Sequence, residues 1–203
     1  MVYLNDHLEK IDVEKSLSLV SQQRQQTTLR FRHQEDRQQS LAVYLLLCKA
    51  LRKEYGIIQM PLFTYGPNGK PSLHGFPHIH FNLSHCLQAA LCVVDSQPVG
   101  CDVEVVPDKL DLDLCRYCCN PQEVETILSS PHPPLAFTKL WTQKEAFLKM
   151  TGEGLSVDMP SLFSSQEAGK KTIQTYSSPD FSYVFSICTI PSSSLSLTPF
   201  FCE

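Results

Sequence analysis

The sequence has no hydrophobic run long enough to cross a membrane. Its longest strongly apolar segment, LAVYLLLC at residues 41–48, is far shorter than the roughly 20 residues that a membrane-spanning helix needs. The first residues, MVYLNDHLEK, are polar and charged and therefore do not resemble a secretory signal. We expect a cytoplasmic protein with no membrane partner.

A strong excess of either charge is also absent. Lys and Arg together number 17, and Asp and Glu number 21, which gives a net charge of −4. This balance provides no overall attraction to nucleic acid, so we expect no nucleic-acid partner, and any anionic ligand has to be bound by a local patch. Cysteine, in contrast, is abundant and odd in number, at nine residues. Without an export signal, we interpret these residues as reduced thiols.

The order of the predicted elements indicates an α+β fold with antiparallel sheets. Helical periodicity covers residues 10–55, and the clearest helix spans 135–151 and ends at Gly152. A segment rich in Gly, Pro and Asn at 65–72 predicts a loop. Strands are predicted at 87–94, 99–106 and 181–188, the last of them half-buried.

Two acidic residues interrupt the apolar strand at 99–106. Side chains alternate along a strand, so Asp102 and Glu104 lie on one face together with Gly100. Two carboxylates only about 6–7 Å apart repel each other unless a positive charge lies between them, and Mg²⁺ favours such oxygen ligands. The alternative is an edge strand with a solvated outer face. The opposite, apolar face holds Val99, Cys101, Val103 and Val105.

The helix predicted at 135–151 carries a second group of polar residues. Trp141, Glu145 and Lys149 follow one another at intervals of four and line one side of the helix. Glu145 supplies a third carboxylate, and Lys149 can neutralise a phosphate beside the cation. The alternative is an ordinary surface Glu–Lys pair with Trp141 in the core. The neighbouring face, which we expect to pack on the core, holds Phe137, Leu140, Phe147 and Leu148.

Four motifs together resemble the 4′-phosphopantetheinyl transferase superfamily, in its Sfp-like branch. They occur in the order and spacing of that family, and the resemblance covers roughly residues 24–190. The strand motif and the helix motif are specific as a pair, and the two other motifs make a coincidence implausible. The motifs are GKP at 69–71, FNLSH at 81–85, VGCDVE at 99–104 and WTQKEAFLK at 141–149.

The resemblance implies a particular architecture. Its members are pseudo-dimers, in which two similar α+β lobes related by a pseudo-two-fold axis bind coenzyme A in the cleft between them. We expect an N-terminal lobe at 1–97, a C-terminal lobe at 98–203 and a monomeric protein. Residues 107–128 correspond to the variable segment that meets the carrier protein. The candidate contacts are Leu110, Leu112, Leu114 and Arg116, with the core of a short helix as the alternative role.

The resemblance also implies a reaction. A serine of an apo acyl or peptidyl carrier protein receives the phosphopantetheine arm of coenzyme A, and 3′,5′-ADP leaves. Mg²⁺ is expected on Asp102, Glu104 and Glu145, where it also binds the diphosphate. Lys149 adds a fixed positive charge, and Glu145 is the candidate general base for the serine hydroxyl, although a metal ligand is a poor base.

Further positions match coenzyme A contacts of the family. Ser84 and His85 are expected to contact its phosphates, with a structural, hydrogen-bonded histidine as the alternative for His85. Lys70 and Pro71 resemble the loop that flanks the adenine, and Lys70 in that loop can reach a phosphate, with a solvated turn lysine as the alternative. Arg24 matches one basic site on the N-terminal side.

The N-terminal side departs from the family pattern. An Arg that is common in the family appears here as Gln39, and a basic position further upstream appears as Thr27. Recognition of the 3′-phosphate is therefore in doubt, and a catalytically silent coenzyme A or nucleotide-binding module is the alternative function. Possible substitutes for the lost basic residues are Arg30, Arg32 and Arg37.

A zinc-bearing interaction protein is a more distant alternative. The segment CRYCC has a C-x-x-C spacing, but no second pair lies at the spacing of a zinc finger. The residues concerned are His74, His78, His80, Cys115, Cys118 and Cys119.

Overall fold

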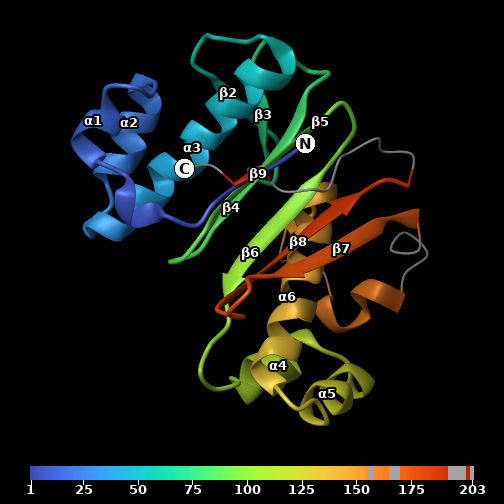
Figure 1. Cartoon of the computed structure of the whole chain (residues 1–203). Coiled ribbons are helices and arrows are strands. Elements are labelled where there is room, and N and C mark those ends of the chain that lie inside the picture. The colour runs from blue at the N-terminus through green and yellow to red at the C-terminus, as the bar shows by residue number, and fades with distance from the viewer. Residues whose placement is uncertain (155–157, 165–169, 192–199, 202–203) are drawn as a thin grey trace.

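The computed structural model describes residues 1–154, 158–164, 170–191 and 200–201. It is an α+β fold, as predicted, with two main sheets that are each covered by a long helix (Figure 1). The helices are η1 (Leu8–Lys10), α1 (Val13–Leu17), α2 (Gln22–Leu29), α3 (Gln34–Tyr55), α4 (Leu112–Cys118), α5 (Pro121–Leu128), α6 (Pro133–Thr151) and η3 (Met159–Ser164). The strands are β1 (Val2–Asn5), β2 (Phe63–Tyr65), β3 (Pro71–Leu73), β4 (His80–His85), β5 (Ala90–Asp95), β6 (Gly100–Val105), β7 (Thr172–Ser177), β8 (Tyr183–Thr189) and β9 (Phe200–Phe201).

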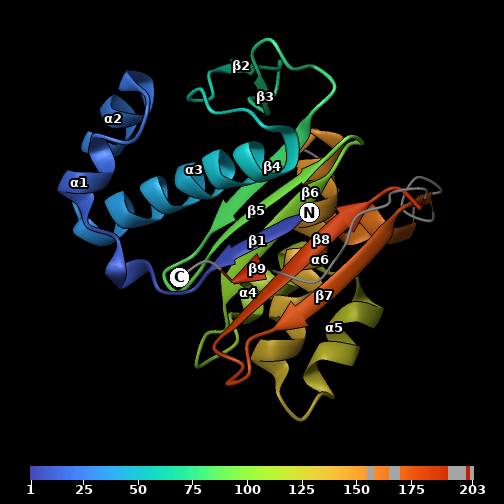
Figure 2. The ribbon, with the colours of Figure 1, turned by 45° about the horizontal axis from the view of Figure 1, so that its top comes forward.

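The first sheet has the strand order β4-β5-β1-β9, with α3 lying across it (Figure 2). Its pairs are antiparallel except for β1 and β9, which are parallel. The helical region predicted at 10–55 is divided into three helices, because Asp12 and Ser21 each cap a new helix with a side-chain oxygen. Helix α3 ends at Gly56, which adopts the left-handed conformation.

The second sheet has the antiparallel order β6-β8-β7 and packs against α6. Helix α6 begins with Pro133 and ends before Gly152, which has φ 78° and serves as the C-cap, so the predicted end of the helix is confirmed. The prediction of a half-buried strand at 181–188 is wrong. Every residue of β8 is buried, because α6 covers one face and the first sheet covers the other.

The two sheets meet along β4 and β6. Apolar residues of β1 and β5 form one buried cluster with those of β6 and β8. Side chains of β4 also bond to the backbone of β6: Asn82 Oδ1 accepts from the Cys101 amide at 2.8 Å, and Ser84 Oγ accepts from the Val103 amide at 3.3 Å. The FNLSH and VGCDVE motifs are therefore held side by side. The pseudo-two-fold relation of the two lobes stays a prediction.

In the described part of the chain, no helix is both long and apolar enough to span a membrane.

Candidate active site

Strand β6 alternates as its sequence predicts. Val99, Cys101 and Val103 are buried in the cluster between the sheets, whereas Gly100 lies against the backbone of α6. Asp102 therefore faces α6 as well, since residues two apart on a strand share a face. Its side chain is only 2% exposed, which contradicts the solvated edge strand that the sequence left open.

Helix α6 brings Lys149 to this buried carboxylate. The Lys149 Nζ donates to Asp102 Oδ1 at 2.5 Å and to Ser84 Oγ at 3.1 Å, and Ser84 Oγ donates to the same Asp102 oxygen at 2.8 Å. Burial alone lowers the pKa of Lys149, but the Asp102 carboxylate outweighs it and raises that pKa. Three residues from three of the predicted motifs thus form one hydrogen-bonded cluster.

Glu104 lies one step further along the same face of β6. Its carboxyl accepts a hydrogen bond from the Trp141 side chain, so the first residue of the helix motif also contacts β6. Burial and the nearby Asp102 charge raise the pKa of Glu104 to about 7, well above its ordinary value. A cation close to this carboxyl would stabilise its ionised form.

Glu145 completes the predicted set of acids. Burial raises its pKa, with a further contribution from Asp102 that Lys149 opposes. Among the described residues, Asp102 Oδ2 and Glu145 Oε1 are buried and have no hydrogen-bond partner. Buried carboxylate oxygens without a partner are costly, and they suit a hard cation such as Mg²⁺. The donors present at Asp102 and Glu145 therefore fit such an ion.

The three acids are not gathered around a single point. Within the ranges that the structure describes, no group of three or more His, Cys, Asp or Glu side chains is close enough to hold a metal ion. The Lys149 ammonium binds one Asp102 oxygen, and Trp141 binds the Glu104 carboxyl. The metal roles of Asp102, Glu104 and Glu145 accordingly stay predictions.

A pocket of about 260 Å³ adjoins this cluster. Lys70 and Pro71 line one side of it, and Glu145 and Lys149 line the other. The Lys70 Nζ donates to the Met150 carbonyl oxygen at 2.6 Å and so satisfies an end of α6, which differs from the solvated turn lysine considered above. The pocket thus combines the GKP loop, placed between β2 and β3, with the helix motif.

His85 and Arg24 lie on the N-terminal side of the cluster. His85 Nδ1 is 2.9 Å from Gln39 Oε1, so the residue that replaces the family's Arg is the direct neighbour of this histidine. Desolvation and the cations Lys149 and Arg24 lower the pKa of His85. Arg24 itself donates to Ser40 Oγ at 3.3 Å, and its guanidinium lies 5.1 Å from the centre of the Tyr44 ring. Arg24 is therefore held in place close to His85.

Lys144 was not singled out from the sequence, yet it is fully buried. Its Nζ donates to Glu123 Oε2 at 2.7 Å, to the Cys118 carbonyl oxygen at 2.8 Å and to the Met159 carbonyl oxygen at 2.9 Å. A single ammonium thereby ties α4, α5 and η3 to α6. The available signal was a lysine placed among the apolar residues of an otherwise core-facing part of the helix.

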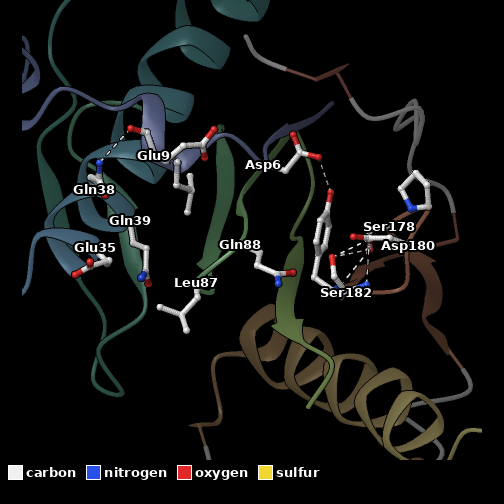
Figure 3. Close-up of a pocket in the computed structure, with 13 residues that line it drawn as sticks. Asp6, Glu9, Glu35, Gln38, Gln39, Leu87, Gln88, Ser178, Asp180 and Ser182 are labelled. Carbon is white, nitrogen blue, oxygen red and sulfur yellow. Dashed lines mark hydrogen bonds between the residues drawn. The ribbon is translucent and has the colours of Figure 1, made fainter. Parts of the chain in front are cut away.

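A larger pocket of about 530 Å³ lies elsewhere, between η1, the start of α3 and the turn from β7 to β8 (Figure 3). Its lining is polar and acidic, with Asp6, Glu9, Glu35 and Asp180 around it. Such a lining repels a diphosphate. Gln39 lines it, but none of the residues predicted to bind coenzyme A or the metal does, so the smaller pocket beside Lys149 is the candidate site.

The chain is similar to known proteins over most of its length. The family model of the 4′-phosphopantetheinyl transferase superfamily matches residues 98–194. A 4′-phosphopantetheinyl transferase of Bacillus subtilis is 32% identical over 164 residues, which cover 79% of this chain and 72% of the relative. The transferase psf-1 of Bacillus pumilus is 30% identical over 201 residues, covering 92% of this chain and 85% of the relative. The Sfp transferase of Bacillus subtilis strain 168 is 28% identical over 163 residues, covering 79% of this chain and 72% of the relative. The chain therefore belongs to the 4′-phosphopantetheinyl transferase superfamily.

Proposed function

We propose that the protein transfers the 4′-phosphopantetheine arm of coenzyme A to a serine of an apo acyl or peptidyl carrier protein and releases 3′,5′-ADP. It acts as a Mg²⁺-dependent monomer in the cytoplasm. Family membership supports the transfer of phosphopantetheine. The observation that carries the finer proposal is the cluster of Lys149, Asp102 and Ser84 beside a pocket that the GKP loop also lines.

The diphosphate of coenzyme A is placed at this cluster. Lys149 lines the pocket and donates to the Ser84 hydroxyl next to it, and Lys70 and Pro71 line the part of the same pocket assigned to the adenosine. Phosphoryl transfer depends chiefly on positioning and on neutralising charge, which is what these groups offer. Asp102 and Glu145, with their unpartnered oxygens, would hold Mg²⁺, with Glu104 as the third ligand. When bound, Mg²⁺ polarises the diphosphate and stabilises the charge of the leaving group.

The transfer is one displacement at phosphorus. The carrier serine oxygen forms a bond to the phosphorus that bears pantetheine, and the bond from that phosphorus to the bridging oxygen breaks. The electron pair of the broken bond leaves with 3′,5′-ADP. Glu145 is assigned as the acceptor of the serine proton, directly or through water, although its role as a metal ligand makes it a poorer base than a free carboxylate.

The carrier protein is placed on the α4–α5 segment. Carrier proteins of this family are typically acidic with an apolar patch, and this segment exposes apolar side chains next to a basic one, Arg116. Leu112 and Leu114 are 42% and 39% exposed, which fits the contacts expected from the sequence, and Tyr117 is 75% exposed and adds to them. Leu110, in contrast, is partly buried against the apolar cluster formed mainly by α4, α5, α6 and η3.

Incubation with coenzyme A, Mg²⁺ and several apo carrier domains tests the function. Mass spectrometry is expected to show one phosphopantetheine added to a carrier serine, and chelation of Mg²⁺ should abolish the addition. The matched variant Asp102→Asn keeps the size of the side chain but removes its charge, and it should be inactive. Coenzyme A binding without addition to any carrier would instead identify a silent binding module.

A further inference from the structure

The Lys149 ammonium occupies the place where a cation is needed. Asp102 is 2% exposed, and a buried carboxylate requires a counter-charge. Lys149 supplies that charge at 2.5 Å, with its own side chain 32% exposed toward the pocket. The carboxylate is thus already neutralised before any metal arrives.

This arrangement works against a free divalent cation. Asp102 Oδ2 and Glu145 Oε1 have no partner among the described residues, so both are available as ligands. An ion bound there would lie within a few ångströms of the Lys149 ammonium, and like charges at such a distance repel. A diphosphate bound beside Lys149 would remove this conflict, because its anionic oxygens would accept hydrogen bonds from the ammonium and Asp102 would be left to hold the metal.

We propose that Lys149 acts as an internal counter-cation, so that the site takes a divalent cation together with a diphosphate and binds the free cation poorly. The proposal rests on the function proposed above only in assigning the diphosphate to coenzyme A. Lys149 therefore selects for the metal–diphosphate complex as a unit, in addition to any contact with the transferred phosphate.

Binding of Mn²⁺, followed by electron paramagnetic resonance, tests this selection. The wild-type protein is expected to bind free Mn²⁺ weakly and to bind it roughly tenfold or more tightly when coenzyme A is present. Lys149→Met should bind free Mn²⁺ roughly tenfold more tightly than the wild type and gain less from coenzyme A. Equal or weaker binding of free Mn²⁺ by this variant would overturn the proposal.

Lys139→Met is the matched control. It removes the same charge from the same helix, but in the N-terminal half of α6, more than two turns before Lys149. Its affinity for free Mn²⁺ should equal that of the wild type. If Lys139→Met gains as much affinity as Lys149→Met, net charge explains the effect and the counter-cation role is wrong.

Two further measurements cover the case in which Lys149→Met folds poorly because Asp102 loses its partner. Thermal unfolding should then show that Mn²⁺ stabilises Lys149→Met more than it stabilises the wild type. In the wild type alone, Mn²⁺ and coenzyme A should strengthen each other's binding by the same factor, since linkage is reciprocal. A factor near one would overturn the proposal without any variant.

The carrier-modification assay keeps this proposal separate from the proposed function. Coupled binding of Mn²⁺ and coenzyme A without modification of any carrier would support the counter-cation role and contradict the transfer. Carrier modification with free Mn²⁺ binding that does not depend on Lys149 would support the transfer and contradict the counter-cation role.

Discussion

Gly100 lies directly against the backbone of Ala146. A Cβ at position 100 would overlap the Ala146 carbonyl oxygen and the Met150 amide, and would lie 2.8 Å from the Met150 Cβ. Because a helix backbone cannot yield locally, Gly100→Ala should push α6 away from β6. We expect a loss of about 1–3 kcal/mol in the free energy of unfolding, measured with urea, and a larger loss of activity, since Glu145 and Lys149 move relative to Asp102.

Gly66→Ala is the control for this substitution. A Cβ there would have the Lys70 carbonyl oxygen at 3.7 Å as its nearest neighbour, which is an ordinary contact. Its stability should stay within about 0.5 kcal/mol of the wild type. A Gly100→Ala protein as stable and active as Gly66→Ala would contradict the close packing of α6 on β6.

Replacing the buried Lys144 should loosen the α4–α5 segment. Lys144→Met removes the ammonium that donates to the Glu123 carboxylate and to the carbonyls of Cys118 and Met159, and leaves that carboxylate without its counter-charge. Removing one partner of a buried ion pair costs about 3–5 kcal/mol, so we expect a loss toward that range in urea unfolding. Hydrogen exchange should accelerate mainly in α4 and α5.

The double variant Lys144→Met with Glu123→Gln checks the cause. In the structure the Asn120 backbone amide donates to the Glu123 carboxylate. A glutamine at position 123 keeps a side-chain oxygen for this amide but removes the unpaired negative charge. The double variant should therefore be more stable than Lys144→Met alone. Additive losses from the two substitutions would show that the ion pair is not what holds this segment.

The stability of the protein should fall as pH rises through the titration of Glu104. Its pKa is raised to about 7 in the folded state from an ordinary value of 4.5, so between these values the folded protein retains a proton that the unfolded chain has lost. The stabilisation is complete below about pH 4.5 and is lost as pH approaches and passes 7.

Unfolding midpoints measured from pH 5 to 8 test this titration. Glu104→Gln, which stays neutral throughout, should show a flatter decline than the wild type. Glu125→Gln removes an exposed carboxyl on α5 and should follow the wild-type curve. Identical slopes for Glu104→Gln and the wild type would mean that Glu104 does not titrate in this range.

Gln39 should limit recognition of the 3′-phosphate. It is the side chain that contacts His85, at a position where the family commonly has Arg. Gln39→Arg adds a cation there, and a hydrogen bond to a charged group contributes about 1.5–3 kcal/mol. We expect the preference for coenzyme A over its 3′-dephospho form, measured by calorimetry, to rise roughly tenfold or more.

Gln26→Arg provides the comparison, because it adds the same charge at an exposed position of α2. It should leave the preference between the two ligands unchanged. An unchanged preference in Gln39→Arg would mean that the 3′-phosphate does not bind beside His85.

Local patterns predicted the parts of the fold that depend on local packing. The alternation in β6 and the end of α6 at Gly152 were predicted because apolar periodicity and a left-handed C-cap can be seen within a few residues of sequence. The region 10–55 was predicted as one helical stretch. The structure divides it at Asp12 and Ser21, and a single capping residue is a weak signal in a sequence. Strand β8 was predicted to be half-buried, because the alternation of its residues cannot show that the first sheet covers the face that α6 leaves open.

The site illustrates the same limit. Motifs identified Asp102, Ser84 and Lys149, but not their mutual hydrogen bonds, because these join residues that are distant in sequence. Lys144 was overlooked for a related reason: a lysine normally marks an exposed position, and only the tertiary structure shows the acceptors that allow its burial.

The final strand of the described chain, β9, runs parallel to the first, with Phe200 opposite Tyr3 and Phe201 opposite Leu4. During synthesis on the ribosome, β1 therefore emerges long before the strand that covers its outer edge. Until residues 200–201 are translated and pair with it, that edge offers unpaired amides and carbonyls to any neighbouring polypeptide. A premature stop shortly after β8 would leave the edge open permanently and make the shortened product prone to aggregate.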